Sequence, residues 1–432
     1  MEKLKKDKFQ WDQLLVKLVI AYFIFGSIFI TFRLLVLGSA SSTTIPEYIL
    51  SLLPEIFILI IIFLVIRYRS DSHKISFTEL RLFDYLVLGY IFTNVILGVF
   101  LSGNIILALH AIRLTYIPML FYFIARLGIR KNLEDYEGIL TKIMNWYIIV
   151  AIAGVLLYFF MPDLMKRMIE ITGSEEQFYY IKRMCSVFWT PVVFGTFMCF
   201  FSLFSYYKLI RNNGYGKIVI FSFFWGCLFL SVSRGANVVF FIGMITLTIV
   251  YSNYRAFLKG IAGIAIVLTI LLFYNYQVFN TLRFIPLSTI DLLMLKEDQT
   301  RVFFWTEALN EYKRNPMGYG LGKAGHIGER FFEKGSLEAS TYSTDGWYLK
   351  LANETGVWGL ISYFFLALVF LIQAFNYWKR NKRTFFTFLF LVFILVGIHN
   401  LVSNVIDYYT YSSLYWLIIG FTQNCIHNKK DE

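Results

Sequence analysis

The sequence predicts an all-α integral membrane protein that crosses the membrane many times. Of its 432 residues, 58% are hydrophobic and only 16% are charged, whereas about a quarter of the residues in a soluble domain are charged. Apolar runs of about twenty residues recur along the chain, and each is long enough to cross the hydrocarbon layer as a helix. The alternating ten-residue segments of an outer-membrane barrel are missing. This composition excludes a water-soluble globule.

We expect about twelve membrane-spanning helices and one large outer loop between the ninth and tenth. The first helix follows a basic start and no small-residue cleavage site comes after it, so we expect a retained span. The chain then divides into helices 1–9 over 1–275, an extracytoplasmic loop subdomain over 276–353, and helices 10–12 with a cytoplasmic tail over 354–432. The expected spans are 14–37, 48–66, 83–101, 105–124, 143–161, 187–207, 217–232, 235–250, 258–275, 354–375, 384–403 and 408–425.

Basic residues indicate which loops face the cytoplasm, where Lys and Arg are in excess. The segments 38–47, 102–104 and 404–407 carry no basic residue. We therefore expect both termini to be cytoplasmic, and the net charge of +12 reflects topology and not a nucleic-acid partner. The segments that we place inside carry basic residues throughout, among them Lys5, Arg69, Arg126, Arg211, Lys259, Arg380 and Lys429.

The longest polar stretch, 277–353, is the first place to look for a site, because long loops usually carry function. Within it, TRVFFWTEALNEYKR at 300–314 has apolar residues at helical spacing. The letters NPMGYGLG that follow contain one Pro and three Gly, which end a helix. We expect a small extracytoplasmic subdomain that contains one amphipathic helix.

Four arginines are expected on the outer side or inside a span, where the positive-inside tendency disfavours them: Arg113, Arg183, Arg234 and Arg301. A guanidinium group can bind two phosphate oxygens at once and stays charged. We therefore hypothesise that the four arginines form a cradle for a lipid diphosphate. Alternatives remain for each. Arg113 could pair with Asp84 or Glu55, and the others could be surface charges, with Arg234 in a turn that happens to be polar.

If the lipid diphosphate carries a glycan, transfer of that glycan to a hydroxyl group also needs a base. The base must lie within hydrogen-bond reach of the attacking hydroxyl. Asp345 precedes the helix expected to begin at Trp347, and it could act as the base or as that helix's N-cap. Glu354 and His326 are further candidates, although His326 lies in a Gly-rich segment and could simply be exposed. Flat faces for sugars, or interfacial anchors, are offered by Tyr319, Tyr342, Trp347 and Tyr348.

No metal and no cofactor is expected. The four cysteines, Cys185, Cys199, Cys227 and Cys425, form no CxxC pair, and no His/Cys cluster has metal-ligand spacing. The outer loop has no Asp/Glu cluster of the DxD kind. We therefore expect neither a disulfide framework nor a zinc site.

Three motifs resemble those of the O-antigen polymerase and O-antigen ligase superfamily. They are RVFFWTEALNEYKRNPMGYGLG at 301–322, TDGWYLKLANETGVWGL at 344–360, and SVSRGA at 231–236. The resemblance implies a GT-C-like fold and an inverting glycosyltransferase that uses a glycan linked to undecaprenyl diphosphate. It implies that Arg234 and Arg301 hold the diphosphate, with Arg113 and Arg183 as weaker assignments. Asp345 stands where the ligases carry a His.

The function implied is a polysaccharide polymerase in the cytoplasmic (inner) membrane of a bacterium. It would join lipid-linked repeat units into O-antigen, and so lipopolysaccharide, or into capsular or exopolysaccharide. Its partners would be the donor and acceptor glycans, membrane lipid and a chain-length regulator, with no nucleic acid. A ligase that transfers polysaccharide to lipid A core is the first alternative, and a flippase or transporter is the second, because many helices with buried charges also suit transport.

Overall fold

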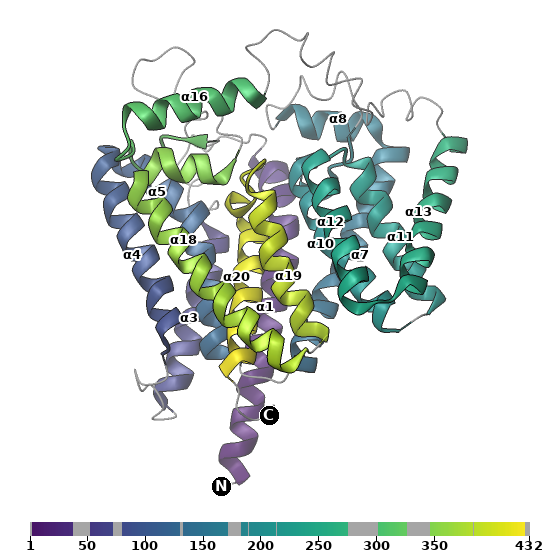
Figure 1. Cartoon of the computed structure of the whole chain (residues 1–432), viewed down its shortest axis with the longest axis horizontal. Helices are drawn as coiled ribbons and strands as arrows, with labels where there is room; N and C mark the ends of the chain where they lie inside the picture. Colours follow the sequence, from purple (N-terminus) through teal and green to yellow (C-terminus); the bar gives the residue numbers. More distant parts are fainter. Residues whose placement is uncertain are drawn as a thin grey trace. The chain divides into compact units, whose positions relative to one another are not determined.

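The computed structural model describes residues 2–37, 52–71, 80–129, 133–171, 183–188, 190–212, 214–274, 301–325, 346–382 and 384–427. Within these ranges every regular element is a helix, which confirms the all-α prediction there (Figure 1). Each of the twelve predicted apolar runs overlaps a helix among the described residues. The number of membrane crossings stays a prediction, because only six helices of the described chain are both long and apolar enough to span a membrane.

The chain forms two compact units that interleave along the sequence. Unit 1 comprises residues 1–57, 131–285 and 384–395. Unit 2 comprises residues 58–130, 286–383 and 396–432. Helix α3 (Leu53–Asp71) begins in unit 1 and continues in unit 2, and α19 (Thr384–His399) does the same.

Unit 1 is built around helix α10 (Pro191–Arg211), which is almost entirely buried. Pro191 occupies the first turn of α10, where its missing N–H leaves no hydrogen bond broken. Helices α11, α12 and α13 all contact α10. The other helices of unit 1 are α1 (Glu2–Leu37), α7 (Leu133–Phe160), α8 (Pro162–Ile171), η5 (Ser186–Phe188), α11 (Tyr215–Leu230), α12 (Arg234–Tyr251) and α13 (Tyr254–Tyr274).

Aromatic rings fill the core of unit 1. The ring of Phe197 on α10 lies 4.8 Å from the ring of Tyr147 on α7 and 4.9 Å from that of Phe188 in η5. Such offset ring pairs add stabilisation beyond the area that they bury. The short segment 183–188 is thereby held between α7 and α10.

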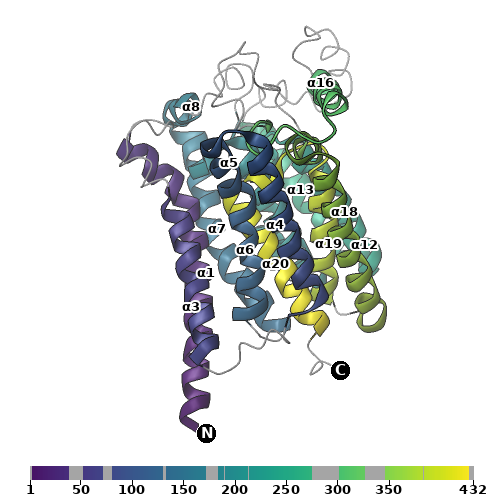
Figure 2. The same cartoon turned by 90° about the vertical axis from the view of Figure 1, so that its left-hand side faces the viewer.

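Unit 2 pairs α4 (Leu82–Ser102) with α18 (Trp347–Asn381), and α20 (Tyr409–His427) with the segment 117–128. Figure 2 shows α4, α6, α18 and α20 running along one another. Asn104 caps the helix after α4, because its Oδ1 accepts hydrogen bonds from the amides of Ile106 and Leu107. The remaining elements of unit 2 are α5 (Ile105–Ala111), η2 (Ile112–Tyr116), η3 (Ile117–Met119), α6 (Leu120–Phe123), η4 (Ile124–Gly128), α16 (Arg301–Arg314) and η7 (Val405–Asp407).

Two features of unit 2 bear on the predicted outer loop. The amphipathic helix expected at 300–314 is present as α16, which ends at Arg314, so this prediction is confirmed. Helix α18 begins at Trp347, and the last residues assigned to the loop, 347–353, are therefore helical. The backbone of α18 breaks at Gly356, which has φ 67° and ψ −158°, and the helix consists of two parts joined by a kink.

Candidate functional site

The S-V-S-R turn of unit 1 joins α11 to α12. The Ser231 hydroxyl donates to the Leu228 carbonyl at 2.6 Å and accepts from the Ser233 amide at 3.3 Å. Val232 between them has φ 53°, a left-handed conformation that is a strained outlier for a β-branched residue. Because strain of this kind persists only where the surroundings enforce it and gathers at functional sites, this turn is a candidate site on geometry alone.

Arg183 contacts this turn, and Arg234 lies at its end. The Arg183 Nε donates to the Ser231 carbonyl at 3.1 Å, and the Met184 amide donates to the Leu230 carbonyl at 2.9 Å. Arg234 is the first residue of α12 and is exposed. A cation at a helix N-terminus opposes the helix dipole, whereas an anion there would be bound by both the guanidinium and the first amides of the helix.

The glycine loop of unit 2, residues 315–325, docks onto the kink of α18. The amides of Tyr319 and Gly320 donate to the carbonyls of Asn353 and Glu354 at 2.7 and 2.9 Å, and the Val357 amide donates to the Pro316 carbonyl at 2.9 Å. The kink removes these groups from the helical ladder, and a buried backbone group without a partner is costly. The loop supplies the partners that the broken helix lacks.

Two glycines make this docking possible. Gly356 has φ 67°, and a Cβ there would lie 2.4 Å from the Met317 carbonyl. Gly320 has φ 99°, and a Cβ there would lie 2.1 Å from the Ser102 amide nitrogen. Both positions need a left-handed backbone and a close approach that only glycine permits.

A cluster of charges lies beside the docked loop, with Lys350 and Glu354 buried and Asp407 half-buried. We call Lys350, Glu354, Asp407 and Thr115 the lysine cluster. The Lys350 ammonium lies 2.8 Å from Asp407 Oδ2, 3.3 Å from the Thr115 hydroxyl and 3.7 Å from Glu354 Oε2. Thr115 donates to Asp407 Oδ1 at 3.0 Å, and Glu354 Oε1 accepts from the Gly322 amide at 2.9 Å. The cluster satisfies charges that would be expensive to bury singly.

The predicted glycan-binding residues have different surroundings. Tyr319 is half-buried, and its hydroxyl donates to Glu311 Oε2 at 2.9 Å; burial and this bond to the Glu311 carboxylate raise the pKa of Tyr319. The Tyr348 hydroxyl donates to the Gly397 carbonyl at 3.0 Å, and the ring stacks on Phe364. Both rings are partly accessible to a ligand.

Trp347 and Glu354 are buried, with 2% and 3% of their surface exposed. The Trp347 ring packs against the ring of Tyr363 at 4.6 Å, and Glu354 belongs to the lysine cluster. In place of the glycan contact that the sequence suggests, the structure shows packing for Trp347 and an ion pair for Glu354. Neither side chain offers a surface to a sugar.

Several predicted residues lie outside the part that the structure describes: His326, Tyr342 and Asp345, together with the side chain of Arg301. The N-cap position of α18 is occupied by Gly346. The amides of Gly346 and Trp347 donate to Asn404 Oδ1 and to the Asn400 carbonyl. Both bonds come from the segment 400–404, and neither requires the carboxylate of Asp345.

Arg113 lies in η2, a π-helical turn inside the segment 105–128. Such turns occur often at functional sites. Of its two suggested acidic partners, Asp84 contacts a different arginine, with Arg126 Nε 3.3 Å from Asp84 Oδ1. Arg126 was expected in a cytoplasmic loop, but it is 5% exposed and also donates to Asn424 at 3.1 Å. Arg126 therefore lies buried in η4 and not in a loop, and the side of the membrane that its segment faces stays a prediction.

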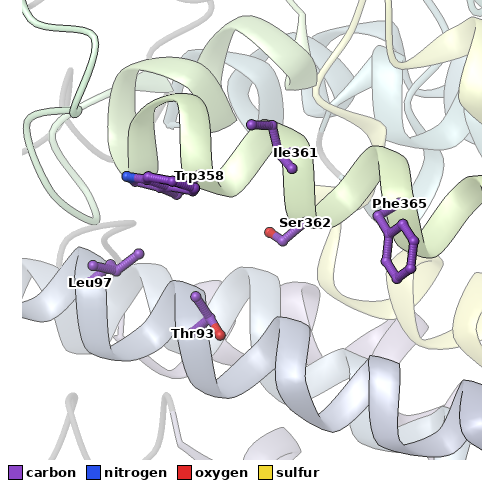
Figure 3. A pocket seen from close by; sticks show the side chains of 6 residues that line it. All are labelled: Thr93, Leu97, Trp358, Ile361, Ser362 and Phe365. Atoms are coloured by element: carbon purple, nitrogen blue, oxygen red, sulfur yellow. The ribbon is translucent and has the colours of Figure 1, made fainter.

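An open apolar groove runs between α4 and the part of α18 that follows the kink. Figure 3 shows Trp358 and Phe365 on α18 facing Thr93 and Leu97 on α4, with Ser362 between the helices. Ser362 accepts a hydrogen bond from Asn94 at 3.1 Å. The groove adjoins the docked loop, since Leu321 of the loop packs against Gly98 of α4.

Sequence reasoning missed Lys350, Asp407 and Thr115. The one local signal was the spacing of Lys350 and Glu354 four residues apart, an attractive pair on a helix, inside an apolar run. Charges in such a run usually face a partner and mark a site. Within the described ranges, no group of three or more His, Cys, Asp or Glu residues could hold a metal, and Cys185, Cys199, Cys227 and Cys425 are buried free thiols.

Residues 219–364 match the family model described as O-Antigen ligase. The matched region begins in α11 and includes the S-V-S-R turn, α16, the glycine loop and the kink of α18. It confirms the superfamily predicted from the three motifs, and it gives no support to a flippase or transporter. Comparison with curated proteins finds no match.

Proposed function

Because this chain carries a domain of the O-antigen polymerase and ligase superfamily, we propose that it is a polysaccharide polymerase. It joins oligosaccharide repeat units carried on undecaprenyl diphosphate into O-antigen or into capsular or exopolysaccharide. The reaction takes place at the outer face of the bacterial cytoplasmic membrane, with both termini of the chain in the cytoplasm. A chain-length regulator would act as a separate partner.

The observation that carries this proposal is the S-V-S-R turn. It holds an exposed guanidinium, Arg234, at the N-terminus of α12 and a second one, Arg183, on the Ser231 carbonyl. This arrangement suits a diphosphate, because helix amides and guanidinium groups bind the same phosphate oxygens. Arg113 and Arg301 are the other proposed diphosphate ligands.

In the proposed reaction a hydroxyl of the acceptor glycan attacks the anomeric carbon of the donor glycan. A new glycosidic C–O bond forms, the bond from that carbon to the diphosphate oxygen breaks, and undecaprenyl diphosphate leaves with the bonding electron pair. Attack from the opposite face inverts the anomeric centre. Arg234 and Arg301 stabilise the charge that develops on the leaving group.

Asp345 is proposed to accept the proton of the attacking hydroxyl, or to orient that hydroxyl. The N-cap position of α18 is Gly346 and not Asp345, which supports a chemical role for Asp345 over a capping one. Tyr319 and Tyr348 are the proposed sugar-stacking residues among those described, and His326 and Tyr342 remain proposals of the same kind.

A ligase that transfers finished polysaccharide to lipid A core is the second candidate, and the description of the matching family favours it. Both reactions use the same lipid-diphosphate leaving group and differ in the acceptor. The absence of a His at position 345, where the motif of the ligases carries one, supports the polymerase.

Deletion of the gene in its host separates the two candidates. The surface polysaccharide is resolved on a gel, and the lipid-linked glycans are extracted in parallel. If the protein is a polymerase, single repeat units should remain on their carrier or on the core after the deletion, with no ladder of longer chains. Complete loss of polysaccharide from the core together with accumulated lipid-linked polymer would identify a ligase, and an unchanged ladder would refute both.

A further inference from the structure

The lysine cluster joins four segments that are far apart in the sequence. Lys350 and Glu354 come from α18, Asp407 from η7, Thr115 from η2, and the Gly322 amide from the glycine loop. All of them belong to unit 2. One ammonium group, 1% exposed, therefore ties the first turns of α18 to η7 and η2 directly, and its neighbour Glu354 ties them to the glycine loop.

Two of these segments carry residues of the proposed site. Thr115 lies two positions after Arg113 in the same π-helical turn, and the glycine loop carries Tyr319 three positions before Gly322. A shift of Thr115 must move the backbone of Arg113 with it, because the two share one turn. The cluster is thus in a position to set where Arg113 lies relative to the glycine loop.

Stability alone does not explain such a cluster. Burying an ion pair yields little net stabilisation, and apolar residues of similar volume often serve a fold equally well. Two carboxylates share the single ammonium, and their hydrogen bonds to Thr115 and Gly322 are directional. Directional contacts of buried charges fix one geometry among several that apolar packing would allow.

We propose that Lys350 and Asp407 are positioning residues for the transfer reaction, acting through Thr115 on the π-helical turn that carries Arg113. This inference rests on the proposed function, in which Arg113 binds the donor diphosphate. The pair touches no substrate. It holds the Arg113 turn in the geometry that the diphosphate requires.

The test is a double-mutant cycle between Asp407→Asn and Arg113→Ala. Membranes that contain the full-length chain are assayed with the lipid-linked glycan extracted from the deletion strain. Alone, Asp407→Asn is expected to raise KM about tenfold and to change kcat less than about twofold, because it weakens binding and not the chemical step. In the Arg113→Ala background the same change should have no further effect, because coupled residues are not additive.

Asp84→Asn is the matched control. Asp84 is another buried carboxylate of unit 2 and is paired with Arg126, so a purely structural loss should affect both variants alike. The control is expected to change KM by the same factor in both backgrounds. Thr115→Val provides a second variant if Asp407→Asn fails to accumulate, because it keeps the side-chain shape and removes the hydroxyl that bonds to Asp407; it should give the same non-additive result.

Equal factors for Asp407→Asn in the two backgrounds would overturn the positioning role. So would a normal KM for Arg113→Ala in an active enzyme, and in that case the proposed function, which rests on Arg234, would stand. If the native chain transfers no glycan in this assay, the proposed function itself fails.

Discussion

The S-V-S-R turn of unit 1 and the lysine cluster of unit 2 handle charge in opposite ways. Arg234 is exposed at the start of a helix, and no ion pair to it lies among the residues that the structure describes. Lys350 is buried and has three oxygen neighbours within 3.7 Å. The strain at Val232 adds to the contrast, because the turn keeps an unfavourable conformation while the cluster satisfies its members.

This difference separates two uses of a charged residue in a membrane enzyme. A charge that must meet a substrate has to remain accessible, and its favourable interaction arises only when the ligand binds. A charge that positions other groups has to be satisfied before the ligand arrives. On this basis Arg234 should control catalysis directly, and the residues around the glycine loop should control whether the site exists at all.

The largest expected effect is loss of transfer on removal of Arg234. Arg234→Ala should lower the rate of polymerisation by about a hundredfold or more, because a group that stabilises leaving-group charge is removed. Arg234→Lys should restore little, since an ammonium cannot make the paired contacts of a guanidinium. The readout is polymer length on a gel in the deletion strain, with the membrane level of each variant measured by immunoblot.

Arg255→Ala is the matched control for Arg234, because it removes another exposed arginine, near the start of α13 (Tyr254–Tyr274), in a segment predicted to be cytoplasmic. It should leave polymer length unchanged. Normal polymer in Arg234→Ala would remove the distinction between the turn and the cluster.

The next effect concerns folding of the glycine loop. Gly320→Ala places a Cβ 2.1 Å from the Ser102 amide nitrogen and forces alanine into a left-handed backbone, so it should destabilise unit 2 by about 3 kcal/mol or more. Gly89→Ala on α4 has nothing within 4 Å of the new Cβ and should be neutral or slightly stabilising. Thermal unfolding of the detergent-purified proteins compares the two, and equal melting temperatures would contradict the docking of the loop on α4.

The sequence predicted the elements whose signals are local. Apolar runs predicted the helices, and the Pro and Gly residues after Arg314 predicted the end of α16. Proline has no N–H to donate to the helical ladder and glycine readily leaves the helical conformation, so a helix tends to end at such residues. The S-V-S-R turn was also predicted from the local sequence. Aromatic residues were less informative, since Trp347 in a core and Tyr348 at a surface have the same pattern around them.

Long-range pairs could not be predicted from one sequence. Lys350 and Asp407 are separated by 57 positions, and the sequence around either residue does not indicate that the two are in contact. The burial of Arg126 could not be predicted for the same reason, because counting basic residues near the end of a span takes no account of Asp84, which comes from another helix. Which charges are buried and paired depends on the packing of the helices, and local sequence signals do not predict that packing.

The smallest expected effect tests the covered side of the S-V-S-R turn. Cys185 lies in the segment that packs on this turn and is fully buried, and burial raises the pKa of its thiol to about 12. At pH 8 only about one thiol in 10⁴ would then be ionised, and because the side chain is also inaccessible, maleimide should label Cys185 very slowly in native membranes. Arg234→Cys, on the exposed side of the same turn, should be labelled within minutes at pH 8, because an exposed thiol has a pKa of about 8.5. Mass spectrometry of the labelled peptides distinguishes the two sites, and rapid labelling of Cys185 at pH 8 would show that the turn is open on both sides.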